Sequence, residues 1–316
     1  MSLHVVIGCG PAGAATARLL AAQGHRVRAV TTTGPTGRSP EPGIEHVALD
    51  ATDGERLTAA ARGAAAIHHC AAPPYPRWAS DWPPLASSVC AAAEATGAVL
   101  VMLGNLYGYG PVDRPMTEEL PLAATGPKGR VRAAAWEQAR TLHEQGRIRA
   151  VEVRASDFFG PGVGDGGHLA ARVVPRLLRG KPVSTLGDPD APHSWTYLPD
   201  VARTLVEVAG REEAWGRPWH VPTEPPRSAR EMVDRLAATA GTGPVTVRRL
   251  PSAALGVASL FSPLIRELKE IRYQFDGPFV VDSSAYETAF GMRATPLDEQ
   301  LTQTVAWWRE RLAATG

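Results

Sequence analysis

The run VVIGCGPAGAATARLL, from Val5 to Leu20, decides the fold. It carries Gly8, Gly10 and Gly13 in a G-x-G-x-x-G pattern, between a short apolar run and an alanine-rich run. The pattern is informative only between a strand and a helix, and both neighbours have that character. We predict a tight turn at Gly8, close approach of a phosphate at Gly10 and close packing of helix on strand at Gly13. The run predicts a dinucleotide-binding turn of the Rossmann type, and a glycine-rich turn with nothing bound is the alternative.

Strand and helix patterns alternate through the first half of the chain. The strands are apolar without alternation, which is typical of a parallel sheet covered on both faces. Strands are predicted at Leu3–Ile7, Arg26–Val30, Glu45–Ala48, Ala65–His69, Val99–Leu103 and Arg149–Val153. Helices are predicted at Pro11–Gln23, Gly54–Ala61, Pro84–Thr96 and Arg130–Gln145, and later at Ala170–Arg179, Val201–Gly210, Ser228–Ala240 and Pro296–Ala314.

The predicted fold class is α/β, a Rossmann-type doubly wound parallel sheet with a smaller C-terminal α/β substrate domain. We place the dinucleotide-binding domain at residues 1–160, with later returns near 190–225. Residues 161–316 form mainly a discontinuous substrate-binding domain. Such an arrangement puts ligands at the carboxyl ends of the strands.

Composition narrows the class of protein. The 316 residues carry 33 lysines and arginines against 32 aspartates and glutamates. Because neither sign is in excess or forms a block, we expect no nucleic-acid and no membrane partner. The 3 cysteines do not suggest a disulfide framework, and we expect a cytoplasmic location. We expect a small-molecule substrate, a monomer or homodimer, and no metal, since His68 and His69 adjoin on a strand and point to opposite faces.

The end of the second strand bears on cofactor choice. An acidic residue there would hold the 2′-hydroxyl of NAD. The sequence instead continues as Val30-Thr31-Thr32-Thr33, and Arg38 follows. Arg38 could meet a 2′-phosphate beside Thr32, so NADP is the predicted cofactor and NAD is possible. A solvated surface arginine is the alternative reading of Arg38.

Five further segments resemble motifs of the extended short-chain dehydrogenase/reductases, the NAD-dependent epimerase/dehydratase group. The resemblance runs almost from end to end and implies that Asp50 meets the adenine, that Asp53 starts a helix and that the strand ending near Ala71 lines the cofactor. The five segments are Leu49 to Asp53 (LDATD), Ile67 to Ala72 (IHHCAA), Leu106 to Gly108 (LYG), Arg154 to Gly162 (RASDFFGPG) and Trp195 to Asp200 (WTYLPD).

The catalytic positions depart from that family. The family's catalytic tyrosine and lysine, four residues apart, are replaced in TEELPLAATGPKGRVR by Lys128 and Arg132, and the serine or threonine position holds Leu103. Two cations one helical turn apart repel each other, which suggests that an anion lies between them. The resemblance implies that Arg132 holds the nicotinamide ribose. A surface lysine that opens a helix is the alternative for Lys128.

Other polar groups are candidates for the same site. Strand alternation places Asn105, and with it Tyr107, on the side facing the nicotinamide. Asp157 stands at the family's asparagine, and a buried carboxylate there could serve as a general acid or base. The alternatives are a turn residue for Asp157 and core packing for Tyr107.

His193 stands where nucleotide-sugar members of the family place an arginine that clamps the diphosphate. Histidine is a weaker phosphate partner, although a plain surface histidine is the alternative. We therefore predict an NADP(H)-dependent oxidoreductase acting on a small non-sugar carbonyl or enone, with Lys128 or Asp157 supplying the proton. The alternatives are a non-redox lyase or isomerase, a catalytically silent dinucleotide-sensing regulator, and a nucleotide-sugar epimerase or dehydratase.

Overall fold

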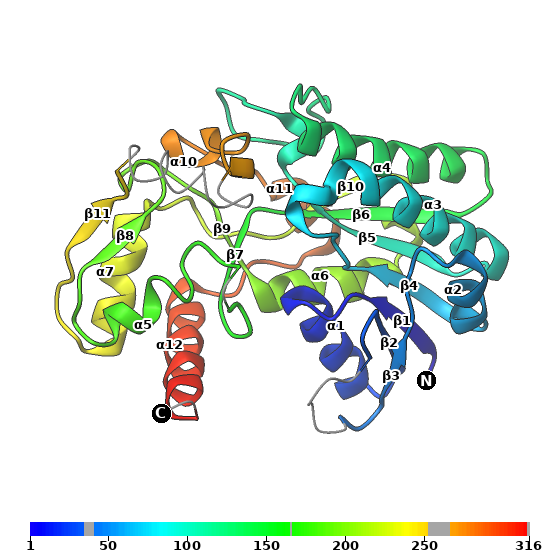
Figure 1. Cartoon of the computed structure of the whole chain (residues 1–316), viewed down its shortest axis with the longest axis horizontal. Helices are drawn as coiled ribbons and strands as arrows, with labels where there is room; N and C mark the ends of the chain where they lie inside the picture. The colour runs from blue at the N-terminus through cyan, green and yellow to red at the C-terminus, as the bar shows by residue number, and fades with distance from the viewer. Residues whose placement is uncertain (35–40, 165, 252–265, 315–316) are drawn as a thin grey trace. The chain divides into compact units, whose positions relative to one another are not determined.

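A computed structural model describes residues 1–34, 41–164, 166–251 and 266–314, and the chain forms two compact units (Figure 1). The first unit contains Met1–Gly110, Pro121–Ala155 and Val201–Trp219. The second contains Pro111–Leu120, Ser156–Asp200 and His220–Gly316. The chain passes from one unit to the other several times, so each unit is assembled from separate stretches of sequence.

A seven-stranded sheet with the order β10-β6-β5-β4-β1-β2-β3 forms the first unit. Its strands are β1 (Leu3–Ile7), β2 (Arg26–Thr31), β3 (Ile44–Ala48), β4 (Ala64–His69), β5 (Val99–Asn105), β6 (Arg149–Ala155) and β10 (Pro218–His220). All pairings from β6 across to β3 are parallel. The chain order reverses between β1 and β4, which creates a crevice at the carboxyl ends of these two strands. The predicted α/β fold with a Rossmann-type parallel sheet is confirmed.

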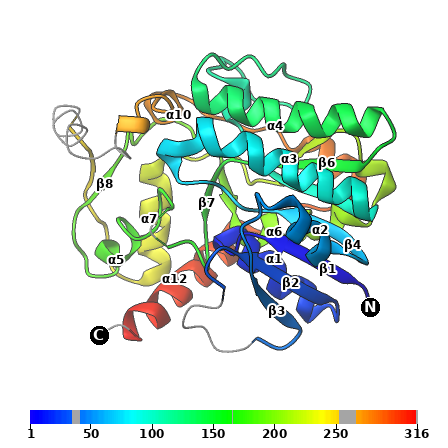
Figure 2. The same cartoon turned by 45° about the vertical axis from the view of Figure 1, so that its right-hand side comes forward.

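The central strand β1 shows why both faces of the sheet are covered. Val5 and Ile7 belong to one hydrophobic cluster, and Val6 belongs to another on the opposite face. The first cluster is completed by helices α2 (Gly54–Ala61), α3 (Trp78–Thr96) and α4 (Pro127–Glu144), and the second by α1 (Pro11–Ala22) and α6 (Leu198–Ala209). Helices α3 and α4 lie side by side on the face of the sheet that the first cluster covers (Figure 2). Short 3-10 turns occur at η1 (Tyr75–Arg77), η2 (Tyr107–Tyr109) and η3 (Glu212–Ala214).

Helix α3 begins at Trp78, whereas the sequence predicted a start at Pro84. Pro83 and Pro84 therefore lie inside the helix. An interior proline costs about 3 kcal/mol or more, but loss of a buried tryptophan costs roughly 3–5 kcal/mol. Trp78 and Trp82 are 7% and 1% exposed, and both belong to the hydrophobic cluster on this face of the sheet. Burial of the two indoles thus extends the helix.

The second unit has two small parallel pairs, β7 (Asp157–Phe159) with β9 (Trp195–Tyr197) and β8 (Val183–Thr185) with β11 (Val247–Arg249). Among its described residues the helices are α5 (Val174–Leu177), α7 (Ala229–Ala240), α10 (Tyr273–Asp276), α11 (Ser284–Phe290) and α12 (Leu297–Ala313). Helix α7 starts with a capping box in which Ser228 and Glu231 bond each other's backbone. None of the helices in the described ranges combines the length and the apolar character needed to cross a lipid bilayer.

Candidate functional site

The glycine turn after β1 is shaped by backbone contacts. Gly8 has φ +87°, and a Cβ there would lie 2.5 Å from the Cα of Ala71, which follows β4. A Cβ on Gly13 would lie 1.8 Å from the carbonyl oxygen of Gly8. At Gly10, by contrast, a Cβ would meet nothing within 4 Å, and Gly10 is the N-cap of α1 without a side-chain cap. The start of α1 is therefore open in the crevice between β1 and β4, and it fits the pyrophosphate of a dinucleotide.

The residues expected on the adenosine side lie on neighbouring loops. Thr32 is exposed in the turn after β2, and Arg38 lies outside the described residues. Asp50, after β3, accepts hydrogen bonds from the Thr52 amide at 2.9 Å and from its hydroxyl at 2.8 Å. These bonds lower the pKa of the Asp50 carboxyl, so it is ionised at neutral pH. Asp53 caps α2, with its Oδ1 accepting the Arg56 amide at 3.1 Å.

The adjacent histidines of β4 pack in different surroundings. His68 Nε2 lies 3.1 Å from His4 Nδ1, whereas the His69 ring meets the Trp82 ring edge-on at 5.3 Å. Burial, together with the charge of Arg132, lowers the pKa of His69 to about 3, and burial with the charge of His4 does the same for His68. Both rings are neutral at physiological pH. The described residues contain no cluster of histidine, cysteine and acidic side chains suited to a metal ion.

Lys128 and Arg132 lie in the first two turns of α4, and both are buried, 3% and 7% exposed. The Lys128 Nζ lies 4.9 Å from the centroid of the Tyr75 ring. The Arg132 guanidinium stacks on Trp82 at 4.4 Å and donates to the carbonyl of Leu103. Burial lowers the pKa of Arg132 although Glu152 opposes this, and arginine still remains charged. Lys128 is thus not a surface lysine, and Arg132 is held by the fold.

The loops after β4 and β5 bring two phenols together. Tyr107 is half-buried, and its hydroxyl accepts a hydrogen bond from the Tyr75 hydroxyl at 3.2 Å. Asn105 is the last residue of β5, and its Oδ1 accepts the Tyr107 amide at 3.1 Å. Sequence reasoning missed Tyr75. The signal was a tyrosine among prolines directly after β4, the strand beside the glycine turn.

In the second unit the structure pairs Asp157 with His193. His193 Nε2 lies 2.9 Å from Asp157 Oδ2, and His193 Nδ1 lies 3.2 Å from the carbonyl oxygen of Gln274. Both ring nitrogens thus lie within hydrogen-bond distance of an oxygen atom. Burial raises the pKa of the Asp157 carboxyl, but the hydrogen bond and charge of His193 outweigh it, so this pKa lies below its usual range. Asp157 keeps 25% of its side chain exposed, and His193 keeps 5%.

Aromatic rings surround this pair. The His193 ring lies 4.3 Å from Trp195 and 5.3 Å from Phe279. His168 stacks on Phe275 at 4.7 Å, and burial lowers the pKa of His168 to about 4. His193 is therefore an interior residue bound by its neighbours and not an exposed ligand group. Its identity as histidine gives no evidence against a diphosphate ligand.

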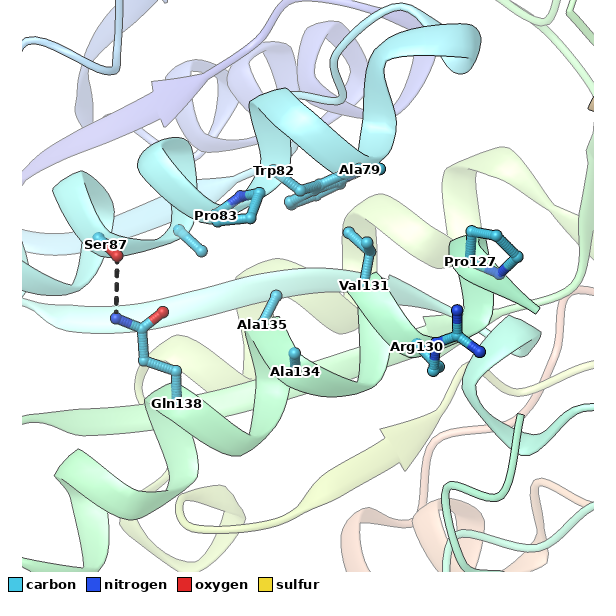
Figure 3. Close-up of a pocket in the computed structure, with 11 residues that line it drawn as sticks. Ala79, Trp82, Pro83, Ser87, Pro127, Arg130, Val131, Ala134, Ala135 and Gln138 are labelled. Atoms are coloured by element: carbon cyan, nitrogen blue, oxygen red, sulfur yellow. Dashed lines mark hydrogen bonds between the residues drawn. The ribbon is translucent and has the colours of Figure 1, made fainter. Parts of the chain in front are cut away.

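A groove of about 350 Å³ lies between α3 and α4. Its walls are apolar, with Trp82 among mostly small side chains, apart from Ser87, Gln138 and Arg130. A 3.2 Å hydrogen bond joins Gln138 to Ser87 (Figure 3). Of the described residues that were predicted for the site, none lines this groove. The groove is thus separate from the glycine turn.

Comparison with known proteins identifies relatives. The model of the NAD dependent epimerase/dehydratase family matches residues 5–221. The chain is 24% identical to dTDP-glucose 4,6-dehydratase of Neisseria gonorrhoeae over 210 residues, 65% of this chain and 56% of that protein. The match thus spans little more than half of that dehydratase's length.

Two solved structures share the fold over nearly the whole chain. UDP-glucose 4-epimerase of Thermotoga maritima with UDP-glucose superposes with a TM-score of 0.80 at 16% identity, over 98% of this chain and 99% of that one. dTDP-glucose 4,6-dehydratase of Bacillus anthracis with NAD gives a TM-score of 0.79 at 16% identity, over 98% and 97%.

These comparisons correct one prediction. The relatives are dehydratases and epimerases of nucleotide sugars, so the predicted oxidoreductase for a small non-sugar carbonyl or enone is wrong. The physical reason is that the prediction depended on His193 as a group facing the ligand. In the structure its two ring nitrogens instead lie within hydrogen-bond distance of Asp157 and of the Gln274 carbonyl oxygen.

Proposed function

The chain belongs to the NAD dependent epimerase/dehydratase family, and from this membership we propose that it is an NADP-dependent enzyme that acts on a nucleoside-diphosphate sugar. The observation that carries the proposal is the open start of α1 at Gly10, beside the two close backbone contacts of Gly8 and Gly13. A loop of this shape suits a dinucleotide pyrophosphate. The substrate class is supported by the relatives, whose names refer to dTDP-glucose and UDP-glucose.

We assign the cofactor contacts as follows. Gly8, Gly10 and Gly13 would hold the pyrophosphate, Asp50 the adenine, Thr32 and Arg38 the adenosine ribose and its phosphate, and Ala71 and Arg132 the nicotinamide half. When bound, the nicotinamide supplies the acceptor and the donor of a hydride. The residues of the chain supply orientation and charge around it.

The reaction site of the proposed enzyme contains Lys128, Asn105 and Tyr107. The buried ammonium of Lys128 would polarise a substrate oxygen and stabilise negative charge that develops on it. Asn105 would orient polar groups at the same strand end. In the second unit, Asp157, ionised and partly exposed, would bind a substrate hydroxyl.

We expect NADPH to bind more tightly than NADH. Residues 31–34, which follow or end β2, carry no carboxylate to hold a ribose 2′-hydroxyl. Calorimetric titration with both dinucleotides measures the preference. An Arg38→Ala variant should lose about 1.5–3 kcal/mol of NADPH binding and no NADH binding. Equal affinities in the wild-type protein would contradict the assignment.

We also expect UDP- and dTDP-sugars to bind and react. Thermal-shift titration of the protein with bound dinucleotide should show a saturable rise in the unfolding midpoint, because a ligand that binds only the folded state stabilises it. Chromatography of the reaction mixture should then show conversion of at least one such sugar. UDP and dTDP without a sugar serve as controls for the nucleotide half. The proposal fails if neither the dinucleotides nor the nucleotide sugars shift the midpoint.

A further inference from the structure

Two tyrosine side chains in the first unit form a hydrogen-bonded pair. Tyr75 Oη donates to Tyr107 Oη at 3.2 Å, and both side chains are half-buried. Tyr75 opens η1 after β4, and Tyr107 opens η2 after β5. β4 and β5 are neighbours, so the two phenols share the carboxyl edge of the sheet, where β4 also borders the glycine turn of β1.

The pair is held rigidly by Trp78. The Trp78 ring stacks on Tyr107 at 5.9 Å and meets Tyr75 edge-on at 4.9 Å. Its Nε1 donates to the carbonyl of Pro73 at 2.9 Å, which fastens the loop that carries Tyr75. The Tyr107 backbone is fixed in turn by Asn105. Two phenols aligned in this way are preorganised to share a proton.

A buried cation accompanies the phenols. Lys128 Nζ lies 4.9 Å from the Tyr75 ring centroid. Arg132 supplies a second positive charge, which acts on Tyr107. Nearby positive charge favours a phenolate over a phenol. The negative charge that remains on the pair after loss of one proton would therefore be stabilised by these nearby cations.

We propose that Tyr75 and Tyr107 are the proton-transfer pair of this enzyme, with Tyr75 as the group that exchanges the proton with the substrate and Lys128 as the counter-charge. The inference rests on the proposed function. In alcohol oxidation the substrate O–H bond breaks, and its proton forms an O–H bond on Tyr75 of the singly deprotonated pair. The C–H bond would break as well, and its hydrogen would leave with both electrons, as hydride, to the oxidised dinucleotide. In reduction, hydride returns to carbon and the proton returns from Tyr75 to oxygen, so atoms and charge balance.

The kinetic test compares Tyr75→Phe, Tyr107→Phe and Tyr109→Phe on the nucleotide sugar that the wild-type protein converts. Tyr109 is the matched control, because it lies in the same turn but its hydroxyl bonds Arg154 in the interior at 2.7 Å. Tyr75→Phe should lower kcat by ~10²–10³-fold, with KM and dinucleotide affinity changed by about twofold or less. Tyr107→Phe should lower kcat by ~10-fold, because Tyr75 keeps the proton but loses its partner. Wild-type kcat in Tyr75→Phe, or a rise in KM alone, overturns the proposal.

A spectroscopic test is independent of turnover. Ultraviolet difference titration of the folded protein should show one phenol of the pair ionising at lower pH than the remaining tyrosines. The early step should vanish in Tyr75→Phe and Tyr107→Phe, persist in Tyr109→Phe, and move to higher pH in Lys128→Met. Failure of every nucleotide sugar to react, with this step present, would refute the proposed function and leave the phenol pair standing. Identical titration curves in all variants would refute the pair.

Discussion

Lys128→Met is expected to reduce turnover by ~10²–10⁴-fold, the range associated with loss of one group that acts on the transition state. Lys128 is one of the few charged side chains that the first unit buries, and it lies over Tyr75 at the strand ends that border the glycine turn. Methionine keeps the length and the apolar stem of lysine, so packing in α4 changes little. NADPH affinity should stay nearly unchanged, because the glycine turn is untouched. Steady-state kinetics and calorimetric titration measure the two quantities.

Lys181→Met is the matched control for this experiment. Lys181 is exposed in the second unit, so the same change of side chain there should leave kcat unaltered. Lys128→Arg should recover part of the lost activity, because it restores the charge without the geometry of an ammonium. Wild-type turnover in Lys128→Met would show that the position does not take part in the reaction.

Acidification is expected to destabilise the first unit well before its carboxylates titrate. The pKa of His69 falls from 6.5 to about 3 on folding, and that of His68 does the same. The unfolded chain therefore takes up these protons below about pH 6.5, whereas the folded chain takes them up only near pH 3. Stability is fully present above pH 6.5 and falls as the pH drops from there to about 3. At pH 5 the burial of each of these two histidines lowers the free energy of unfolding by about 2 kcal/mol, relative to its value above pH 6.5.

Replacement of His69 isolates one of these contributions. Neither ring nitrogen of His69 has a hydrogen-bond partner among the described residues, so His69→Phe removes a titrating group without breaking a bond. Denaturant unfolding at about pH 7.5 and pH 5 should show that the variant loses about 2 kcal/mol less than the wild-type protein between the two conditions. The measurement at the higher pH serves as the control for packing effects. An equal loss in both proteins would mean that His69 is protonated inside the fold.

Sequence reasoning located the sheet because short strand-like runs alternate with alanine-rich helical runs from β1 to β6. It located the glycine turn because the spacing of Gly8, Gly10 and Gly13 has a direct steric meaning. Tyr75 lies in a proline-rich segment without periodicity, and its partner is 32 positions away. The pairing of β4 with β5 and the packing of Trp78 bring the phenols together, and neither can be read from the local sequence. The Asp157–His193 contact likewise spans 36 positions and depends on the pairing of β7 with β9.

The order of strands in the first unit predicts how a truncated fragment of the protein would behave. Strand β10, which comes after residue 200, covers the outer edge of β6, and Val206 of α6 packs on the cluster of Val6 and Leu20. A fragment that stopped near residue 160 would leave β6 with a long, apolar and unpaired edge, the kind of edge that recruits strands from other molecules. The first unit is therefore contiguous in space but not along the chain, and we expect that a fragment ending near residue 160 would aggregate.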